Sequence, residues 1–243
     1  MWLTSSGKDE APPEKYALFI DSWIKNNPDF EIIFWNNSKV KKLWKNPLFS
    51  KYVNTFDKMM LIEKCDMSRY ALLYLYGGVY LDLNTTCYKN ISPLIYNQKL
   101  MLSKEPKEHI EREGRFLVTN SFLASCPMND FWLKFMNYIV KNYKHTGAKE
   151  TVLENTGPAI LGDFSIKNNV PLIDECIVQP YRMNEGNTQS KISKECFRTD
   201  GPYLAKRWEY TAGWGMKDRE GKSVTPWVMF YMLVLAGVLY YAL

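Results

Sequence analysis

The chain has 243 residues, which suits one ordinary domain with an appendage. Its 46% hydrophobic and 15% aromatic residues supply a sizeable core and exclude an intrinsically disordered protein. The net charge of +5 is spread along the chain, so we expect no nucleic-acid partner. Five cysteines without a Cys-x-x-Cys spacing and only two histidines argue against a zinc site, a redox motif or a hydrolytic triad.

Hydrophobic periodicity divides the first eighty or so residues into alternating helices and strands. The predicted elements are a helix over 14–27, a strand over 31–35, helical pieces over 40–44 and 48–53, a long helix over 58–76 and a strand over 79–81. Gly77 and Gly78 end the long helix, because glycine readily adopts the left-handed conformation found there. This alternation predicts an α/β domain with a mostly parallel sheet and helices on both faces.

The pattern is weaker beyond residue 84. Strands are predicted over 100–102, 116–118 and 120–125, with a charged loop over 104–115. Asp130 is expected to cap the next helix. Thr156-Gly157-Pro158 predicts a turn that opens another helix, since proline is favoured in a first helical turn.

Four lysines cluster early in the chain, at positions 39, 41, 42 and 45. One interpretation is the solvated face of a short helix. The other is contact with an anionic membrane surface, to which lysine clusters are attracted. The sequence leaves both interpretations open.

Residues 223–243 carry no charge at all. At 1.5 Å per residue such a helix reaches roughly 30 Å, about the hydrocarbon thickness of a bilayer. Trp227, Tyr240 and Tyr241 stand near its ends, where aromatic belts form. We therefore predict a domain over 1–222 followed by a single membrane-spanning helix over 223–243. A buried terminal helix is the alternative, although a core helix is rarely apolar on every face.

The most informative stretch covers residues 64–84, KCDMSRYALLYLYGGVYLDLN. Asp66 and Arg69 lie three residues apart and share one helix face. Asp82 and Asn84 follow the strand at its carboxyl end, where open α/β sheets bind ligands. Two oxygen-bearing side chains there suit a hard divalent cation such as Mg or Mn, which commonly holds phosphates.

This stretch resembles the sugar-binding region of the DxD-type glycosyltransferases, the family of yeast initiating α-1,6-mannosyltransferase and of the mannosyl-inositol-phosphoceramide synthase catalytic subunits. The family pattern, D-x-x-R-Y-x-x-L-Y-x-x-G-G-x-Y-x-D-x-D, is matched from Asp66 to Asp82 and departs at Asn84. Asn27-Pro28-Asp29, Asn120-Ser121-Phe122 and Thr156-Gly157-Pro158 also match, so the resemblance covers most of residues 2–214. The family's first strand and its carboxyl-terminal histidine pair have no counterpart here.

The resemblance implies a GT-A-like, Rossmann-type fold and metal-dependent, retaining transfer of a hexose from a nucleotide sugar. Asp66, Arg69 and Asp82 would form the catalytic set, with Asp66 and Arg69 holding sugar hydroxyls. Asp82 and Asn84 would flank the Mn or Mg ion. The remaining substrate contacts that it implies are Trp2 on the nucleotide base, Tyr80 lining the sugar pocket and Asn120 on donor or acceptor.

Together with the hydrophobic tail, the resemblance favours mannose transfer from GDP-mannose to a membrane acceptor such as inositol phosphoceramide. It implies a single-pass protein of the Golgi or another endomembrane, in a eukaryote or in a virus of a eukaryotic host. Two alternatives stay open. One is a glycan or polysaccharide acceptor. The other is a non-catalytic, membrane-anchored sugar-nucleotide binder, which Asn84 and the absent histidines favour.

Overall fold

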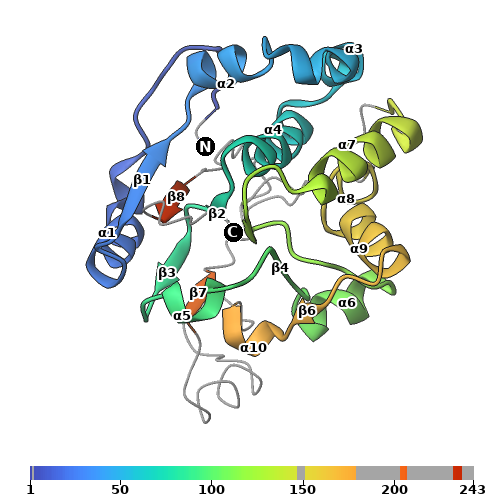
Figure 1. Ribbon diagram of the computed structural model, residues 1–243. Helices are drawn as coiled ribbons and strands as arrows, with labels where there is room; N and C mark the ends of the chain where they lie inside the picture. The colour runs from blue at the N-terminus through green and yellow to red at the C-terminus, as the bar shows by residue number, and fades with distance from the viewer. Residues whose placement is uncertain (2, 147–150, 179–202, 207–231, 237–243) are drawn as a thin grey trace, which may run out of the picture.

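Six strands form the central sheet of the computed structural model, which describes residues 1, 3–146, 151–178, 203–206 and 232–236 (Figure 1). Their order across the sheet is β1 (Phe30–Phe34), β8 (Met232–Ala236), β2 (Gly78–Leu81), β5 (Phe122–Ser125), β4 (Leu100–Ser103) and β6 (Leu172–Ile173). A separate two-stranded antiparallel sheet pairs β3 (Thr85–Cys87) with β7 (Leu204–Lys206). The fold is therefore mixed α/β, as predicted.

The expectation of a mostly parallel sheet is wrong for the hydrogen-bonded pairs that the structure describes. The β1–β8, β8–β2, β2–β5 and β5–β4 pairs are antiparallel, and only β4–β6 is parallel. The reason is that β5 and β8 run against the other four strands, and each is inserted between two of them. The carboxyl ends of β2 and β4 still lie at one edge of the sheet, because both strands are antiparallel to β5.

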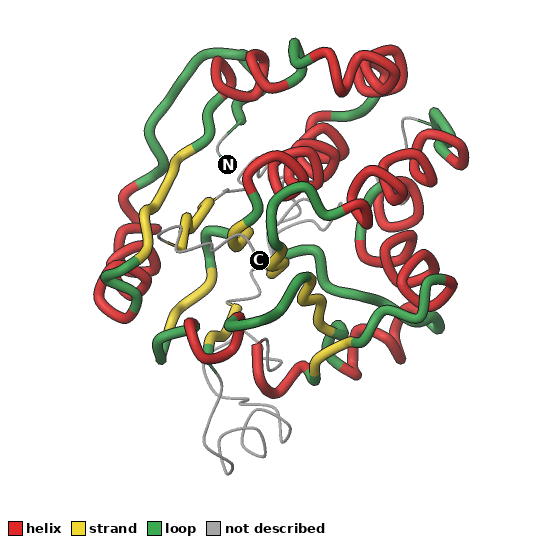
Figure 2. The backbone as a smooth tube through the Cα atoms, viewed as in Figure 1, coloured by secondary structure: helices red, strands yellow, loops and turns green. Residues whose placement is uncertain are grey.

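Helices make up most of the other described residues, and Figure 2 shows them gathered around the strands. They are η1 (Glu14–Tyr16), α1 (Ala17–Asn26), α2 (Asn37–Leu43), η2 (Pro47–Phe49), α3 (Ser50–Lys58), α4 (Leu61–Tyr76), α5 (Ser92–Ile95), α6 (Lys107–Glu113), α7 (Asp130–Asn142), α8 (Val152–Asn155), α9 (Pro158–Lys167) and α10 (Glu175–Val178).

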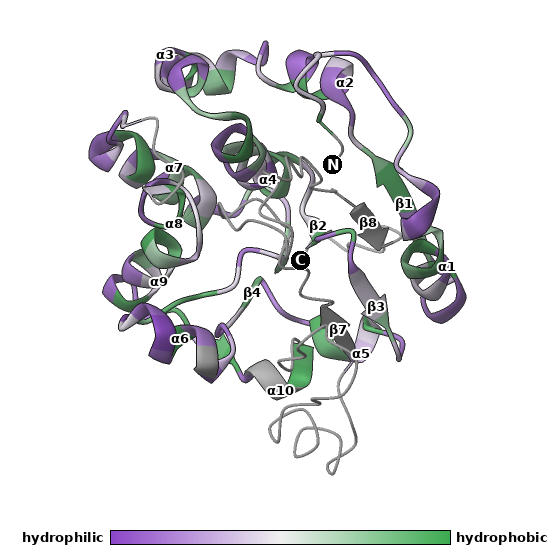
Figure 3. Ribbon diagram, turned by 180° about the vertical axis from the view of Figure 1, so that it is seen from behind, coloured by the Kyte–Doolittle hydropathy of each residue, from purple (hydrophilic) through white to green (hydrophobic). Residues whose placement is uncertain are grey.

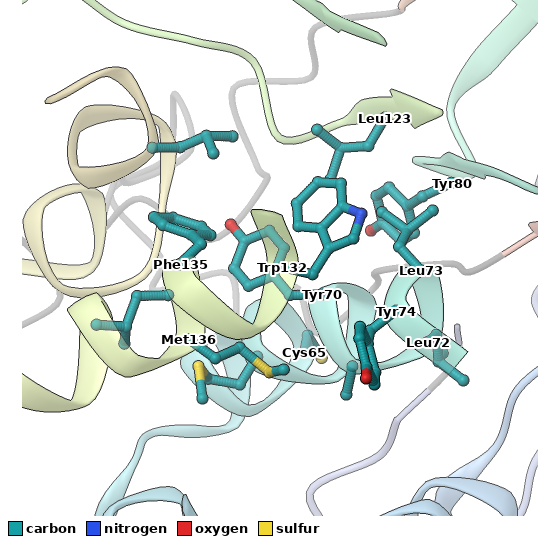
Figure 4. Close-up of a cluster of buried hydrophobic side chains, with 14 of the residues drawn as sticks. Cys65, Tyr70, Leu72, Leu73, Tyr74, Tyr80, Leu123, Trp132, Phe135 and Met136 are labelled. Carbon is teal, nitrogen blue, oxygen red and sulfur yellow. The ribbon is translucent and has the colours of Figure 1, made fainter. Parts of the chain in front are cut away.

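Side chains that alternate along the strands build two cores, one on each face of the sheet. Tyr80, Leu102 and Leu123 join the larger core, which α4, α7 and α9 cover. In Figure 4 the rings of Tyr70, Trp132 and Phe135 lie between α4 and α7. The neighbouring residues of the same strands join the smaller core with Trp23 of α1; they are Val79, Leu81, Met101, Phe122 and Ala124. Helices thus cover both faces, as the sequence predicts.

The local predictions are correct for most of the described residues and wrong in several places. The structure contains the predicted α1, β1, β2, β4, β5 and α9 within a few residues of their expected bounds. Residues 116–118 form no strand but only an isolated bridge between Val118 and Lys104, because the Val118 amide donates to Pro158 at the start of α9 and the Leu117 carbonyl accepts from the Glu105 amide. The predicted charged loop over 104–115 contains α6.

The predicted helix over 58–76 is two helices, α3 and α4, separated by the extended residues Met59 and Met60. The cap of α7 is Asn129 rather than Asp130, since the Asn129 side chain accepts a hydrogen bond of 3.0 Å from the Phe131 amide. Both differences concern element boundaries, which depend on local cap geometry.

The apolar tail is described only at Met232–Ala236, and there it forms β8 rather than part of a helix. An aliphatic run of this kind is also typical of a strand buried on both faces, which explains why hydrophobicity alone predicted a membrane helix. The other residues of the predicted span lie outside the described residues. Among those that the structure describes, no helix has the length and apolar character needed to cross a bilayer.

Gly77 makes the turn from α4 into β2. Its φ of 62° and ψ of −151° fall in a region that residues with a side chain rarely adopt. A Cβ atom there would stand 2.5 Å from the Pro127 nitrogen. The glycine therefore lets β2 start directly beside the segment that follows β5.

We predict that Gly77→Ala lowers the free energy of unfolding by about 3 kcal/mol or more, because backbone strain and a backbone clash add. Gly114→Ala is the matched control. Gly114 has the same φ of 62°, but a Cβ atom added there would meet nothing within 4 Å, so about 1 kcal/mol is expected. Denaturant unfolding measures both, and equal losses would contradict the role of the Pro127 contact.

Candidate active site

The site is built on α4, a helix enclosed on every side. Its residues from Cys65 to Tyr74 are all buried, between the sheet and α7. Glu63 fixes the start of the helix, since its carboxylate accepts a hydrogen bond of 2.9 Å from the Met60 amide. A helix buried all round has no solvated face, so its polar residues must find partners inside the protein.

Arg69 is the centre of these polar contacts. Its side chain is fully buried, and its Nη2 atom lies 2.7 Å from the Asp66 carboxylate. Nη1 lies 3.8 Å from Asp82 and donates to the Asn120 carbonyl. Its guanidinium carbon stands 4.3 Å from the centre of the Tyr80 ring. Burial disfavours the charged form, but Tyr80, Asp66 and Asp82 together raise the pKa of Arg69 above its ordinary value.

Asp66 is held by three donors. Arg69 contacts Asp66 Oδ1, and the side-chain amide of Asn120 donates to the same oxygen at 3.1 Å. The Thr156 hydroxyl donates to Oδ2 at 2.7 Å. Burial raises the pKa of Asp66 to about 7, while Arg69 and Thr156 act in the opposite direction. Its orientation is therefore fixed by α4, by the segment before β5 and by the corner between α8 and α9.

Asp82 lies directly after β2 and is the part of the cluster nearest the solvent. Its side chain is 10% exposed, against 0% for Arg69 and 1% for Asp66. The Tyr80 hydroxyl donates to Asp82 Oδ1 at 2.9 Å, and the Asp82 amide donates to the Ser121 carbonyl at 2.9 Å. Burial raises the pKa of Tyr80 well above its ordinary range, so this hydroxyl stays a neutral donor.

The structure thus brings five of the residues singled out from the sequence into one cluster: Asp66, Arg69, Tyr80, Asp82 and Asn120. Asn84 is half-buried in the turn between β2 and β3, two residues beyond Asp82. Trp2 lies outside the described residues, so its contact with a nucleotide base stays a prediction. Direct contact of Asp66 and Arg69 with sugar hydroxyls also stays a prediction, because both side chains are enclosed here.

Thr156 also contacts the cluster, although the sequence alone gave this residue no role in the site. Besides donating to Asp66, it accepts a hydrogen bond of 2.7 Å from Tyr70 through its carbonyl oxygen. The neighbouring Asn155 donates to Glu63 at 2.9 Å. The match of the Thr156-Gly157-Pro158 segment to the family could have pointed to this residue, but only the fold shows that the segment lies against α4.

The oxygen ligands at the strand end fit a divalent cation shared with a phosphate ligand. No group of three or more His, Cys, Asp or Glu side chains is placed to hold a metal by itself within the described residues. Mg²⁺, however, is commonly held by one or two protein side chains together with substrate phosphates. The Asp82 carboxylate and the amide oxygen of Asn84, a half-buried residue two positions further along the chain, are side-chain oxygens of this type at the end of β2.

Comparison with known proteins identifies the part of the chain that contains Asp66, Arg69 and Asp82. Residues 13–101 match the family model described as "Glycosyltransferase sugar-binding region containing DXD motif". The uncharacterized glycosyltransferase L373 of Acanthamoeba polyphaga mimivirus is 31% identical over 210 residues, which cover 77% of this chain and 75% of that protein.

Two fungal proteins are also similar. Inositol phosphoceramide mannosyltransferase 1 of Schizosaccharomyces pombe is 29% identical over 165 residues, covering 63% of this chain and 47% of that protein. Mannosyl phosphorylinositol ceramide synthase SUR1 of Saccharomyces cerevisiae is 27% identical over 160 residues, covering 63% and 38%. The matched segment thus spans less than half the length of either fungal protein.

We predict that Thr156→Val destabilises the protein by about 2 kcal/mol at about pH 8.5, because a buried, ionised Asp66 loses a donor. Folding raises the pKa of Asp66 to about 7, so the folded protein loses stability as the pH rises through that value and Asp66 ionises. The hydrogen bond from the Thr156 hydroxyl offsets part of this loss. At about pH 5.5 the raised pKa of Asp66 leaves a smaller share of it ionised, so the loss should be smaller.

Thr156→Ser is the matched control, since it keeps the hydroxyl and should cost no more than about 1 kcal/mol for the deleted methyl group. Unfolding free energies at both pH values measure the effect. A Thr156→Val loss that is the same at both would mean that the threonine acts through packing alone.

Proposed function

Because the chain belongs to the family of glycosyltransferases with the DXD sugar-binding region, we propose that it transfers mannose from GDP-mannose, with retention of configuration, to an inositol phosphoceramide-type acceptor. The observation that carries the proposal is the contact of one buried cation, Arg69, with both Asp66 and Asp82. This contact joins the two halves of the family motif at the edge of the sheet where ligands of α/β folds bind.

Arg69 acts as a positioning residue in this proposal. A charge enclosed by two carboxylates and the Tyr80 ring is strongly oriented, because the surrounding low dielectric strengthens each contact. It holds Asp82 at the carboxyl end of β2 and, through the Asn120 carbonyl, fixes the segment before β5. A preorganised polar site needs little rearrangement when a donor sugar arrives.

Asp82 and Asn84 would hold a Mn or Mg ion together with the diphosphate of the donor. When bound, such an ion neutralises charge on the departing phosphate. The carboxylate supplies the charged ligand and the amide a neutral one, so this pair should bind metal less tightly than two carboxylates would. The GT-A-like assignment of the domain belongs to the same proposal; the predicted boundary at residue 222 does not, because β8 adds residues 232–236 to the sheet.

The acceptor assignment rests on the relatives. The names of both fungal relatives refer to a mannosyl transfer onto inositol-containing ceramide lipids. We propose the same acceptor class here, which places the reaction at a membrane surface, in an endomembrane such as the Golgi.

A donor screen with the full chain tests the proposal. We expect GDP-mannose, rather than UDP-glucose, UDP-galactose or UDP-N-acetylglucosamine, to be hydrolysed and transferred in the presence of Mn and not with a chelator. Asp82→Ala should lower this rate by about a hundredfold or more, because the charged metal ligand is lost. Asp29→Ala, at an exposed turn, is the control and should keep the rate. Turnover that survives both chelation and Asp82→Ala would contradict the metal-dependent mechanism.

Restoring the family's second carboxylate separates an active enzyme from a non-catalytic relative, the alternative that Asn84 favours. In an active enzyme Asn84→Asp should lower the Mn concentration for half-maximal rate by about tenfold, since affinity follows the charge of the ligands. Titration of Mn²⁺ against the rate measures it, with Asn90→Asp as the control for the added charge. A folded wild-type chain and a folded Asn84→Asp variant that both lack turnover with every donor would support the non-catalytic alternative.

A further inference from the structure

A pocket lies on the side of α4 that the proposed active site does not use. It has a volume of about 340 Å³, which is within the range of small-molecule sites but at its lower end. Helices α2 and α3 and the first turn of α4 enclose it, and Figure 1 shows these helices near one another. None of the residues that line it takes part in the cluster around Arg69.

The interior of the pocket is apolar. Its apolar lining residues are Leu3, Val40, Trp44, Val53, Phe56 and Leu61. Trp44 and Phe56 stack with their ring centres 4.0 Å apart, and the Trp44 indole donates to Ser68 at 2.9 Å. These contacts hold the indole in place, so the wall is rigid and its polar atom is already bonded within the protein.

The rim of the pocket is basic. Lys41, Lys45 and Lys64 line it, whereas Asp57 is its single carboxylate among the described residues. Lys41 and Lys45 are exposed and stand four positions apart. The Lys64 amine lies 5.6 Å from the centre of the Phe56 ring, at the boundary between the rim and the interior. In Figure 3 the helices α2 and α3 are largely hydrophilic along their outer sides.

We propose that this lysine-rimmed pocket binds one hydrocarbon chain and the phosphate of an anionic lipid. The apolar interior accepts the chain, and the excess of three lysines over one carboxylate attracts the phosphodiester. The inference goes beyond the proposed function, because it assigns a lipid site outside the donor site and requires no transfer reaction. It also gives two members of the early lysine cluster, Lys41 and Lys45, a specific role.

The pocket and the active site share α4. Leu61 and Lys64 line the pocket, while Asp66 and Arg69, one turn further along, belong to the polar cluster. Ser68, the partner of Trp44, lies between the last two in sequence. A lipid bound in the pocket would therefore contact the same helix that carries Asp66 and Arg69.

Binding of dioctanoyl phosphatidylinositol below its critical micelle concentration, measured by calorimetry on the full chain without donor, tests the proposal. We expect it to bind at least about tenfold tighter than dioctanoyl phosphatidylcholine and than free inositol phosphate. Lys41→Glu with Lys45→Glu should weaken it by about tenfold or more. Val53→Trp, which fills the pocket without changing charge, should weaken it as well.

Lys42→Glu with Lys58→Glu is the matched control. Lys42 is exposed on α2 and Lys58 at the end of α3, both lie outside the pocket lining, and the charge change is identical. Equal weakening by the two double variants would overturn the proposal in favour of diffuse membrane attraction. Full affinity in Val53→Trp, or for the headgroup alone, would overturn the chain site. Because no donor is present, these outcomes are independent of whether mannose transfer is found.

Discussion

The rest of the structure depends on the burial of one positive charge. Arg69 is shut off from solvent, and an unpaired charge in that position would be prohibitively unstable. Its partners come from three segments, namely Asp66 on α4, Asp82 after β2 and the Asn120 carbonyl before β5. Removing one partner of a buried pair typically costs about 3–5 kcal/mol, so this contact fixes how the helix sits on the sheet.

A second set of contacts holds α4 from its other neighbours. Glu63 accepts from Tyr143 at 2.8 Å and from Asn155 at 2.9 Å, and Thr156 reaches Asp66. The helix is thus tied to the corner between α8 and α9 as well as to the sheet. This explains why a helix without an amphipathic face is stable here: its polar side chains are satisfied internally, and its apolar ones pack on both sides.

The charged residues of the cluster differ in their exposure to solvent. Arg69 and Asp66 are enclosed, whereas the Asp82 side chain is 10% exposed and Asn84 is half-buried. In the proposed transferase the enclosed pair sets the geometry, and the pair at the strand end meets the metal and the diphosphate. The proposed lysine-rimmed pocket would add a lipid site at the start of α4, apart from the donor site that follows β2.

The sequence by itself determined the helix over α4, the glycine turn, the strand β2 and the family, because these depend on short-range periodicity and on motif spacing. It also identified Asp66, Arg69, Tyr80, Asp82 and Asn120 as candidates. Only the tertiary structure decided that Thr156 supports Asp66, that β5 and β8 make the sheet mostly antiparallel, and that Met232–Ala236 form a strand. Those features depend on contacts between segments far apart in the chain, and an apolar run is equally compatible with a bilayer and with a buried sheet.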